Sequence, residues 1–384
     1  MNSHEKSVRI TLAVMACTIL TAQPLVGHAQ SSVTLGAIVD AGLLYANNAD
    51  GHTAWSATSG QLAASRWLMT GSEPLGSAQR VIFRMMSPFN LQNGRSPGRA
   101  FNVAYVGLAD DRLGTLTAGR QWDTTIDLVS GFATSETWAG YIGPHVGDAD
   151  NMNATFKASN TIKYASPQLA GLSFGATYGF SNASGPGSQT DNRLMSLGAA
   201  FARGSFAAAA GVLQADRPGS QPAGALGSPA AGIRNDYANT FTTSDASAAG
   251  VLLQRIYSAG ASYRLGSVTF GGLYTKVQFR YLDAVRLSLN NYEANLTWQA
   301  TPAWQAGISY VRTNGHYSGT GTNHTSPGWD QINLGTQYAL SKRTVLYLLG
   351  VVQQGRDANA QIVGLVQSST RRQVVMTTGM QQRF

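Results

Sequence analysis

The fold of this chain is indicated most clearly by its last twelve residues, QVVMTTGMQQRF, at positions 373–384. One parity of this segment holds apolar side chains and ends on an aromatic one, namely Val374, Met376, Met380 and Phe384. The other parity is mostly polar, as expected of a strand that lies between apolar surroundings and water. Such a closing strand suggests a barrel in an outer membrane, although a soluble sandwich could also end in this way.

The first 29 residues have the pattern of a secretory signal peptide. Lys6 and Arg9 give a positive start, residues 10–20 form a short apolar core, and Gly27-His28-Ala29 is a small-x-small cleavage site. The apolar run is too short to span a membrane as a helix. Lipoprotein processing at Cys17 is the alternative interpretation. We therefore expect a signal peptide at 1–29 and one β-barrel domain at 30–384.

Composition excludes several classes of protein. The only cysteine, Cys17, lies in the predicted signal peptide, so we expect neither disulfides nor thiolate metal sites in the mature chain. The net charge of +8 falls to +7 when the signal peptide is removed. The basic residues are scattered rather than clustered, which argues against a nucleic-acid partner.

The alternating pattern recurs along the chain, at residues 172–180, 257–265, 292–299, 304–310 and 332–340. One face of each segment is apolar or aromatic, and the other carries small polar residues that suit a water-filled lumen. A packed soluble sandwich would instead need apolar residues on its inner face. Aromatic residues stand near the segment ends, which fits interfacial girdles and also fits ordinary cross-strand packing.

Connections between these segments alternate in length. Short turns are expected at 109–114, 166–171, 265–267, 300–303 and 340–343. Long polar segments are expected at 47–60, 88–98, 121–156, 181–193, 215–252, 314–329 and 354–369. This pattern predicts an all-β fold, a transmembrane antiparallel barrel of about 16 strands with short periplasmic turns and long external loops.

Several stretches, taken in order, resemble the trimeric general porins of Gram-negative outer membranes, and in particular proteobacterial members of that family. They are Ser65-Arg66-Trp67, 71–76 (GSEPLG), 104–108 (AYVGL), 114–121 (GTLTAGRQ), 138–141, 148–151, 160–164, 178–182, 338–344 and Arg383-Phe384. The ordered set covers essentially the whole mature chain. The resemblance implies a homotrimer of 16-stranded barrels, each with its third long loop, here about 121–156, folded into the lumen.

The same resemblance implies a function: a water-filled outer-membrane channel for passive diffusion of ions and small hydrophilic solutes. Its partners would be outer-membrane lipids and the barrel-assembly machinery, for which Phe384 is the expected assembly signal. A channel specific for a sugar or small anion, and an adhesin or structural barrel, are the alternatives.

Enzyme chemistry finds little support in the sequence. His52, His145, His316 and His324 all lie in predicted loops, with no metal-spaced pair and no Ser/His/Asp constellation that stands out. We expect no catalytic residue, no cofactor and no metal. A barrel protease or lipase is the enzyme alternative.

A pore constriction of this family would select by charge and width, with wall bases facing loop carboxylates. Family position gives Arg66, Arg120 and Lys157 as wall bases, and alternation adds Arg80 and Arg84. Candidate loop acids are Glu136, Asp148 and Asp150, although such residues equally often cap turns. The chain departs from the family at Asn102, where relatives are often basic, and by lacking a Pro-Glu-Phe-Gly run. The excess of bases predicts a modest preference for anions.

Arg120 breaks the alternation. Strict period two groups it with Leu116 and Ala118, on the face that should meet lipid. An arginine facing lipid at mid-membrane costs about 2–4 kcal/mol. We therefore expect a bulge or the start of the loop at this point, unless the residue lies beyond the membrane.

Overall fold

The computed structural model describes residues 31–384 except 77, 97, 185–187, 221–222, 227–244, 246 and 248. The predicted signal peptide at 1–29, with Cys17, lies outside the described residues. The strands form one antiparallel sheet in which each strand pairs with the next, except that β2 and β3 both pair with β1, and the last strand returns to the first. They are β1 Ser32–Ala49, β2 His52–Ser59, β3 Arg66–Gly76, β4 Gln79–Pro88, β5 Val103–Asp110, β6 Gly114–Gln121, β7 Ala158–Ala165, β8 Leu172–Gly179, β9 Arg193–Arg203, β10 Phe206–Asp216, β11 Val251–Leu265, β12 Val268–Tyr281, β13 Arg286–Gln299, β14 Trp304–Ser318, β15 Gly328–Ala339, β16 Thr344–Arg356 and β17 Arg372–Arg383.

Seventeen strands make a barrel with 16 wall positions, because β2 and β3 share one of them. β3 pairs with β1 along Ser32–Ile38, and β2 pairs with β1 along Ala41–Ala49. The barrel is closed by β17, which pairs with β1 from Ile38 to Ala46. The predicted fold class and strand number are therefore confirmed.

The sequence prediction was wrong at 47–60, which is not a long loop. Asp50 and Gly51 form a tight turn between β1 and β2, with φ of 52° and 87°. An Asp-Gly pair with positive φ at both residues is a preferred two-residue hairpin turn, because its twist matches that of the strands. The polar character of the segment concealed this turn. The five predicted short turns are confirmed.

The break between β2 and β3, residues 60–65, is held by one buried carboxylate. Asp40 accepts hydrogen bonds from the backbone N–H groups of Gln61 at 3.2 Å, Leu62 at 2.9 Å and Ala63 at 3.1 Å. The Tyr347 hydroxyl donates a further bond to it at 2.8 Å. Asp40 thus satisfies backbone donors that the strand ladder leaves unpaired.

Side chains alternate between the two faces of the closing strand as predicted. Met376, Met380 and Phe384 are exposed on the outer surface, whereas Gln373, Thr377 and Gln381 are buried on the inner side. Aromatic residues near the strand ends also face outward, and they pack across strands, with ring centroids 5.8 Å apart for Trp298 and Trp304. Their cross-strand packing is therefore confirmed, and their outward direction is what an interfacial girdle requires. Among the described residues, no helix is long and apolar enough to cross a membrane.

Deleting Phe384 should lower the amount of heat-modifiable barrel in outer-membrane fractions. The side chain is 66% exposed, so its loss removes little packing, while its backbone N–H donates to the carbonyl oxygen of Ala37 at 2.9 Å and extends the closing ladder. Phe384→Ala keeps this backbone bond and separates the two contributions, and Phe384→Tyr is the control that keeps the ring. Normal amounts of barrel from both the deletion and Phe384→Ala would refute an assembly role.

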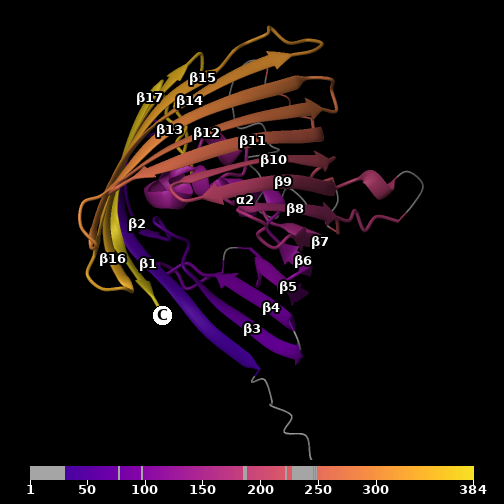
Figure 1. Cartoon of the computed structure of the whole chain (residues 1–384). Helices are drawn as coiled ribbons and strands as arrows, with labels where there is room; N and C mark the ends of the chain where they lie inside the picture. Colours follow the sequence, from indigo (N-terminus) through magenta and orange to yellow (C-terminus); the bar gives the residue numbers. More distant parts are fainter. Residues whose placement is uncertain are drawn as a thin grey trace, which may run out of the picture.

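The segment predicted as the third long loop, named L3 here and comprising residues 122–157, lies inside the barrel. It contains the helix α2, Thr124–Val129, and four short helical turns, Ser130–Phe132, Ser135–Ala139, Gly140–Ile142 and Val146–Asp148; a fifth turn, Ser188–Thr190, lies in a different loop. The strands enclose α2 (Figure 1), and the backbone N–H of Thr124 donates to the hydroxyl of Ser196 on β9 at 3.0 Å. The predicted inward loop is confirmed, with a start one residue later than expected.

Candidate pore constriction

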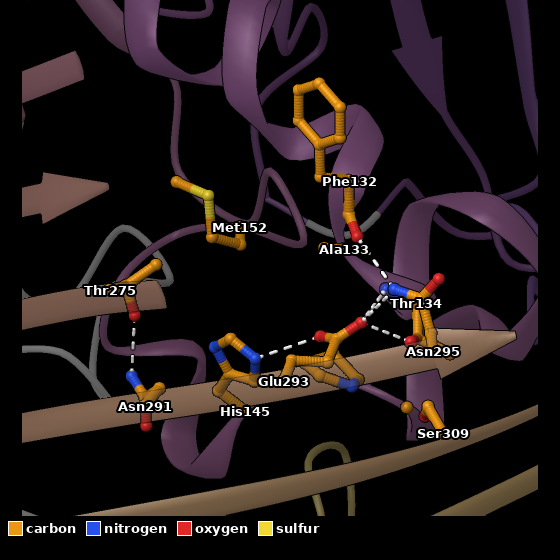
Figure 2. Close-up of polar contacts among 12 residues, drawn as sticks. Phe132, Ala133, Thr134, His145, Met152, Thr275, Asn291, Glu293, Asn295 and Ser309 are labelled. Atoms are coloured by element: carbon orange, nitrogen blue, oxygen red, sulfur yellow. Dashed lines mark hydrogen bonds and ion pairs between the residues drawn. The ribbon is translucent and has the colours of Figure 1, made fainter. Parts of the chain in front are cut away.

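L3 is fixed to the inner wall by a buried network of charged groups around His145. Its Nδ1 lies 2.6 Å from the Asp150 carboxylate of L3, and its Nε2 lies 3.0 Å from the Glu293 carboxylate of β13. Figure 2 shows the imidazole directed from L3 to the strand that carries Glu293. All three side chains are at most 1% exposed. We name the set His145, Asp150 and Glu293 the L3 latch.

Both carboxylates of the L3 latch also accept hydrogen bonds from neutral donors. Glu293 accepts the backbone N–H of Thr134 at 2.7 Å, the Thr134 hydroxyl and the Asn295 amide at 3.0 Å (Figure 2). Asp150 accepts the Thr275 hydroxyl at 2.5 Å and the Asn291 amide at 3.3 Å. Burial alone would lower the pKa of His145, but Asp150 and Glu293 raise it to about 10. The imidazole is therefore protonated at neutral pH and donates to both carboxylates.

Wall glycines make room for L3 where it approaches most closely. A Cβ added at Gly307 of β14 would lie 2.3 Å from the Trp138 ring, and one at Gly335 of β15 would lie 2.8 Å from it. Trp138 is buried, and its carbonyl oxygen accepts from the Gln337 amide at 3.0 Å. Any larger residue at these two positions would push L3 away from the wall.

The anchoring contacts of L3 lie along one arc of the barrel. α2 lies against β8–β11, the L3 latch reaches β12 and β13, and Gln331, Asn333 and Gln337 of β15 bind L3 carbonyl oxygens. At the far end of this arc, L3 contacts the break between β2 and β3, where the Tyr141 N–H donates to the Gln61 carbonyl oxygen at 2.7 Å. The predicted wall bases Arg66, Arg84 and Arg120 belong to the other arc, on β3, β4 and β6.

Four of the five predicted bases gather near the start and end of L3. Arg84 of β4 and Lys157 at the end of L3 both lie against Trp122, with charged atoms 5.7 Å and 5.6 Å from the ring centroid. The Arg120 guanidinium donates to the Ser159 hydroxyl at 2.6 Å. Burial, together with the charges of Arg120 and Arg66, lowers the pKa of Lys157 to about 8 against the opposite pull of Glu136 and Asp148.

The expected irregularity at Arg120 is present. The register of β6 against β7 shifts between Gly119 and Gln121, and Gly119 has a φ of 138°. This bulge interrupts the alternation that leaves Leu116 exposed, and Arg120 is half-buried beside Ser159. Glycine is required at 119 because other residues rarely adopt this φ.

Glu136 is the loop acid that faces the bases. Its side chain is exposed, and among the described residues its carboxylate forms no hydrogen bond or ion pair. Although the side chain is exposed to the lumen, desolvation by the surrounding barrel wall raises the pKa of Glu136, whereas the nearby charges of Lys157 and Arg66 lower it. The structure thus brings together Arg66, Arg84, Arg120, Lys157 and Glu136, which we name the constriction cluster.

Three predicted site residues do not join this cluster. Arg80 pairs with Asp111 at 2.7 Å beside the short turn between β5 and β6. Asp150 belongs to the L3 latch. Asp148 is 2% exposed and accepts the backbone N–H of Asn153 at 2.9 Å and the Thr155 hydroxyl. The two aspartates therefore stabilise a turn-rich part of L3, which is the alternative that the sequence had left open for them.

Sequence reasoning missed Trp122, His145 and Glu293. His145 was treated as one of four loop histidines, and its partner Glu293 stands 148 residues away. One signal was available: Glu293 shares its parity with Asn295, Thr297 and Gln299, so it is a carboxylate on a lumenal face. A buried charge at such a position requires a partner.

Comparisons with known proteins agree with this architecture. Residues 13–357 match the family model for Gram-negative porins. An outer membrane porin of Bordetella pertussis is 32% identical over 189 residues, which is 44% of this chain and 49% of that protein. This alignment therefore spans about half the length of the Bordetella protein. Outer membrane porin protein 32 of Delftia acidovorans is 25% identical over 366 residues, 92% of this chain and 91% of that protein.

Solved structures show the same fold at low sequence identity. The anion-selective porin from Comamonas acidovorans superimposes with a TM-score of 0.72 at 20% identity, covering 92% of this chain and 100% of that one. The trimer form of OmpT from Vibrio cholerae gives 0.67 at 12% identity, covering 92% and 99%. Because the family model spans most of the sequence, this chain belongs to the Gram-negative porins, the channel-forming β-barrels of the outer membrane.

Proposed function

We propose that the protein is a general porin that passes ions and small hydrophilic solutes between L3 and the wall arc formed by β3–β6, with a modest preference for anions. The observation that carries this proposal is the charge balance of the constriction cluster, in which four bases face one exposed carboxylate. Rings of arginine and lysine favour anions in pores, because charges act at close range in a narrow passage.

The hydrogen-bond inventory of the cluster supports the same preference. The Nε–H groups of Arg66, Arg84 and Arg120 and the indole N–H of Trp122 are buried and have no acceptor within the described protein. No acceptor among the described wall residues offsets these donors, so the positive potential of the cluster stays uncompensated and favours anions. The anion-selective neighbour from Comamonas is consistent with this proposal and also favours the second candidate, a channel specific for a small anion.

We further infer that three copies assemble into a trimer, as the trimer form of OmpT does. Insertion would involve the barrel-assembly machinery and outer-membrane lipids. We also retain residues 1–29 as a proposed signal peptide and 30–384 as the proposed barrel domain. The channel role leaves no task for a catalytic group or a cofactor.

Planar-bilayer recording of the purified protein separates the two candidate functions. A general porin should give stepwise, weakly selective conductance that no single solute blocks. A specific channel should be blocked by one member of a panel of small sugars, carboxylates and phosphates at concentrations of roughly micromolar to millimolar. Such a block would show that the protein is a specific channel rather than a general porin. A barrel that inserts into the bilayer but never conducts would favour an adhesin or structural role.

A further inference from the structure

We propose that Trp122 is a positioning residue for ion selectivity: its ring holds the Arg84 and Lys157 cations in the constriction cluster and leaves their charge uncancelled. This inference rests on the proposed anion-preferring passage. It adds a neutral residue to the groups that determine selectivity, whereas the bases and Glu136 act through their own charges.

The backbone of Trp122 is held firmly at the junction of β6 and L3. It directly follows Gln121, the last residue of β6, and precedes Asp123, whose carboxylate caps α2 by accepting the Thr125 N–H at 2.7 Å. The carbonyl oxygen of Trp122 accepts from the Lys163 ammonium at 3.1 Å. Lys163 is itself paired with Asp127 of α2 at 2.5 Å. The indole therefore projects from a fixed point.

Two cations from different elements meet at this indole. Arg84 comes from β4 and Lys157 from the end of L3, and both lie within the distance of about 6 Å at which a cation is attracted to an aromatic face. Neither cation forms an ion pair with any described residue. The Lys157 ammonium otherwise donates to backbone carbonyl oxygens, at 2.6 Å to Ala154 and at 3.4 Å to Thr155.

The bases of the constriction cluster repel one another, so a further group is needed to keep Arg84 and Lys157 in position. The charges of Arg120 and Arg66 both act against that of Lys157, and Glu136 is the exposed acid that offsets them. Long, flexible side chains that repel one another would otherwise separate into the wide parts of the lumen. A carboxylate at position 122 would also attract the Arg84 and Lys157 cations, but its negative charge would cancel one of their two positive charges. An aromatic ring attracts cations through its quadrupole and leaves the net charge of the passage unchanged.

The test compares Trp122→Leu with Trp122→Phe in planar bilayers, using reversal potentials in a potassium chloride gradient. Trp122→Leu should lower the anion-to-cation permeability ratio about two- to fivefold, because a cation–π contact at a partly exposed site is worth about 0.5–1 kcal/mol. Trp122→Phe keeps an aromatic face and should retain most of the preference. Trp122→Met provides a second non-aromatic variant if the leucine variant assembles poorly, as judged by heat-modifiable trimer.

A background without the two cations separates positioning from a change in pore shape. In Arg84→Gln/Lys157→Gln, the further change Trp122→Leu should leave the permeability ratio unaltered, because the ring then has nothing to hold. An equal fall in both backgrounds, or no fall in the native background, would overturn the positioning role. Absence of anion preference in the unmodified protein would instead refute the proposed function, so the two failures are distinguishable.

Discussion

Replacing His145 with alanine should release L3 from the wall while the barrel stays closed. The substitution removes the one cation between two buried carboxylates, Asp150 and Glu293. Removing one partner of a buried ion pair costs about 3–5 kcal/mol, because the remaining charge is left uncompensated. Hydrogen exchange of amides in 130–150 should therefore accelerate by roughly two to three orders of magnitude, since this loop then opens locally.

His316→Ala is the matched control for this prediction. His316 is exposed on β14 and contacts Ser326 at 3.1 Å, so its loss removes an imidazole but no part of the L3 latch. Single-channel recordings should show frequent current fluctuations for His145→Ala and quiet openings for His316→Ala. Unchanged L3 exchange and quiet openings in His145→Ala would show that the latch does not hold the loop.

The L3 latch also predicts a pH window for loop stability. The pKa of His145 is raised in the folded protein to about 10, so its contribution is complete below its unfolded value of about 6.5 and is lost as pH rises through about 10. The His145 charge lowers the pKa of Asp150 against the effect of burial, so that contribution is present above its unfolded value and is lost at acid pH. Asp148, with a pKa raised to about 7 by burial and by Asp150, opposes the latch once it ionises. L3 should thus be held best at mildly acidic to neutral pH, and less firmly as pH rises above about 7.

Replacing Arg66 and Arg120 together with glutamine should shift selectivity toward cations. The change removes two of the four bases in the constriction cluster and leaves Glu136 in place. A unit charge at 4 Å contributes about 1 kcal/mol in water. The anion-to-cation permeability ratio should therefore fall roughly three- to tenfold at low salt, and less at high salt because of screening.

Arg80→Gln removes one positive charge outside the constriction cluster and is the control. Arg80 is paired with Asp111 beside a short turn, and this variant should keep the native ratio. An equal effect of Arg80→Gln and of the double substitution would mean that net charge, rather than the cluster, determines selectivity.

The anion-to-cation permeability ratio of the unmodified protein should also fall between about pH 7 and about pH 9, because Lys157 loses its proton around a pKa of about 8.

Period-two patterning predicted the strands and their outward faces because lipid and water impose opposite demands on alternate residues. Met376, Met380 and Phe384 are exposed as the pattern required. The same rule predicted the bulge at Arg120. Without a bulge, Arg120 would follow Leu116 and Ala118 on the lipid-facing side of the strand, where an arginine is unfavourable. Residues 47–60 were misread because a polar segment was equated with a loop, although Asp50-Gly51 is the signature of a tight hairpin.

The interior of the barrel was far less predictable from sequence. L3 was placed in the lumen only through family resemblance, because composition does not encode an inward fold. The latch between His145 and Glu293 joins residues from distant parts of the chain, with no local motif around either. The sequence also could not show that Glu136 is exposed whereas Asp148 and Asp150 are buried. The exposure of an acidic side chain in this loop depends on the conformation of the backbone turns, which the residue type does not determine.

The reversal potential of the unmodified protein in a potassium chloride gradient at low salt tests the central claim most directly. If ions pass between Glu136 and the four bases of the constriction cluster, the potential must have the sign of anion preference and must shrink as the mean salt concentration rises. A reversal potential of cation-preferring sign at low salt would contradict the account, because the passage would then not run along these bases.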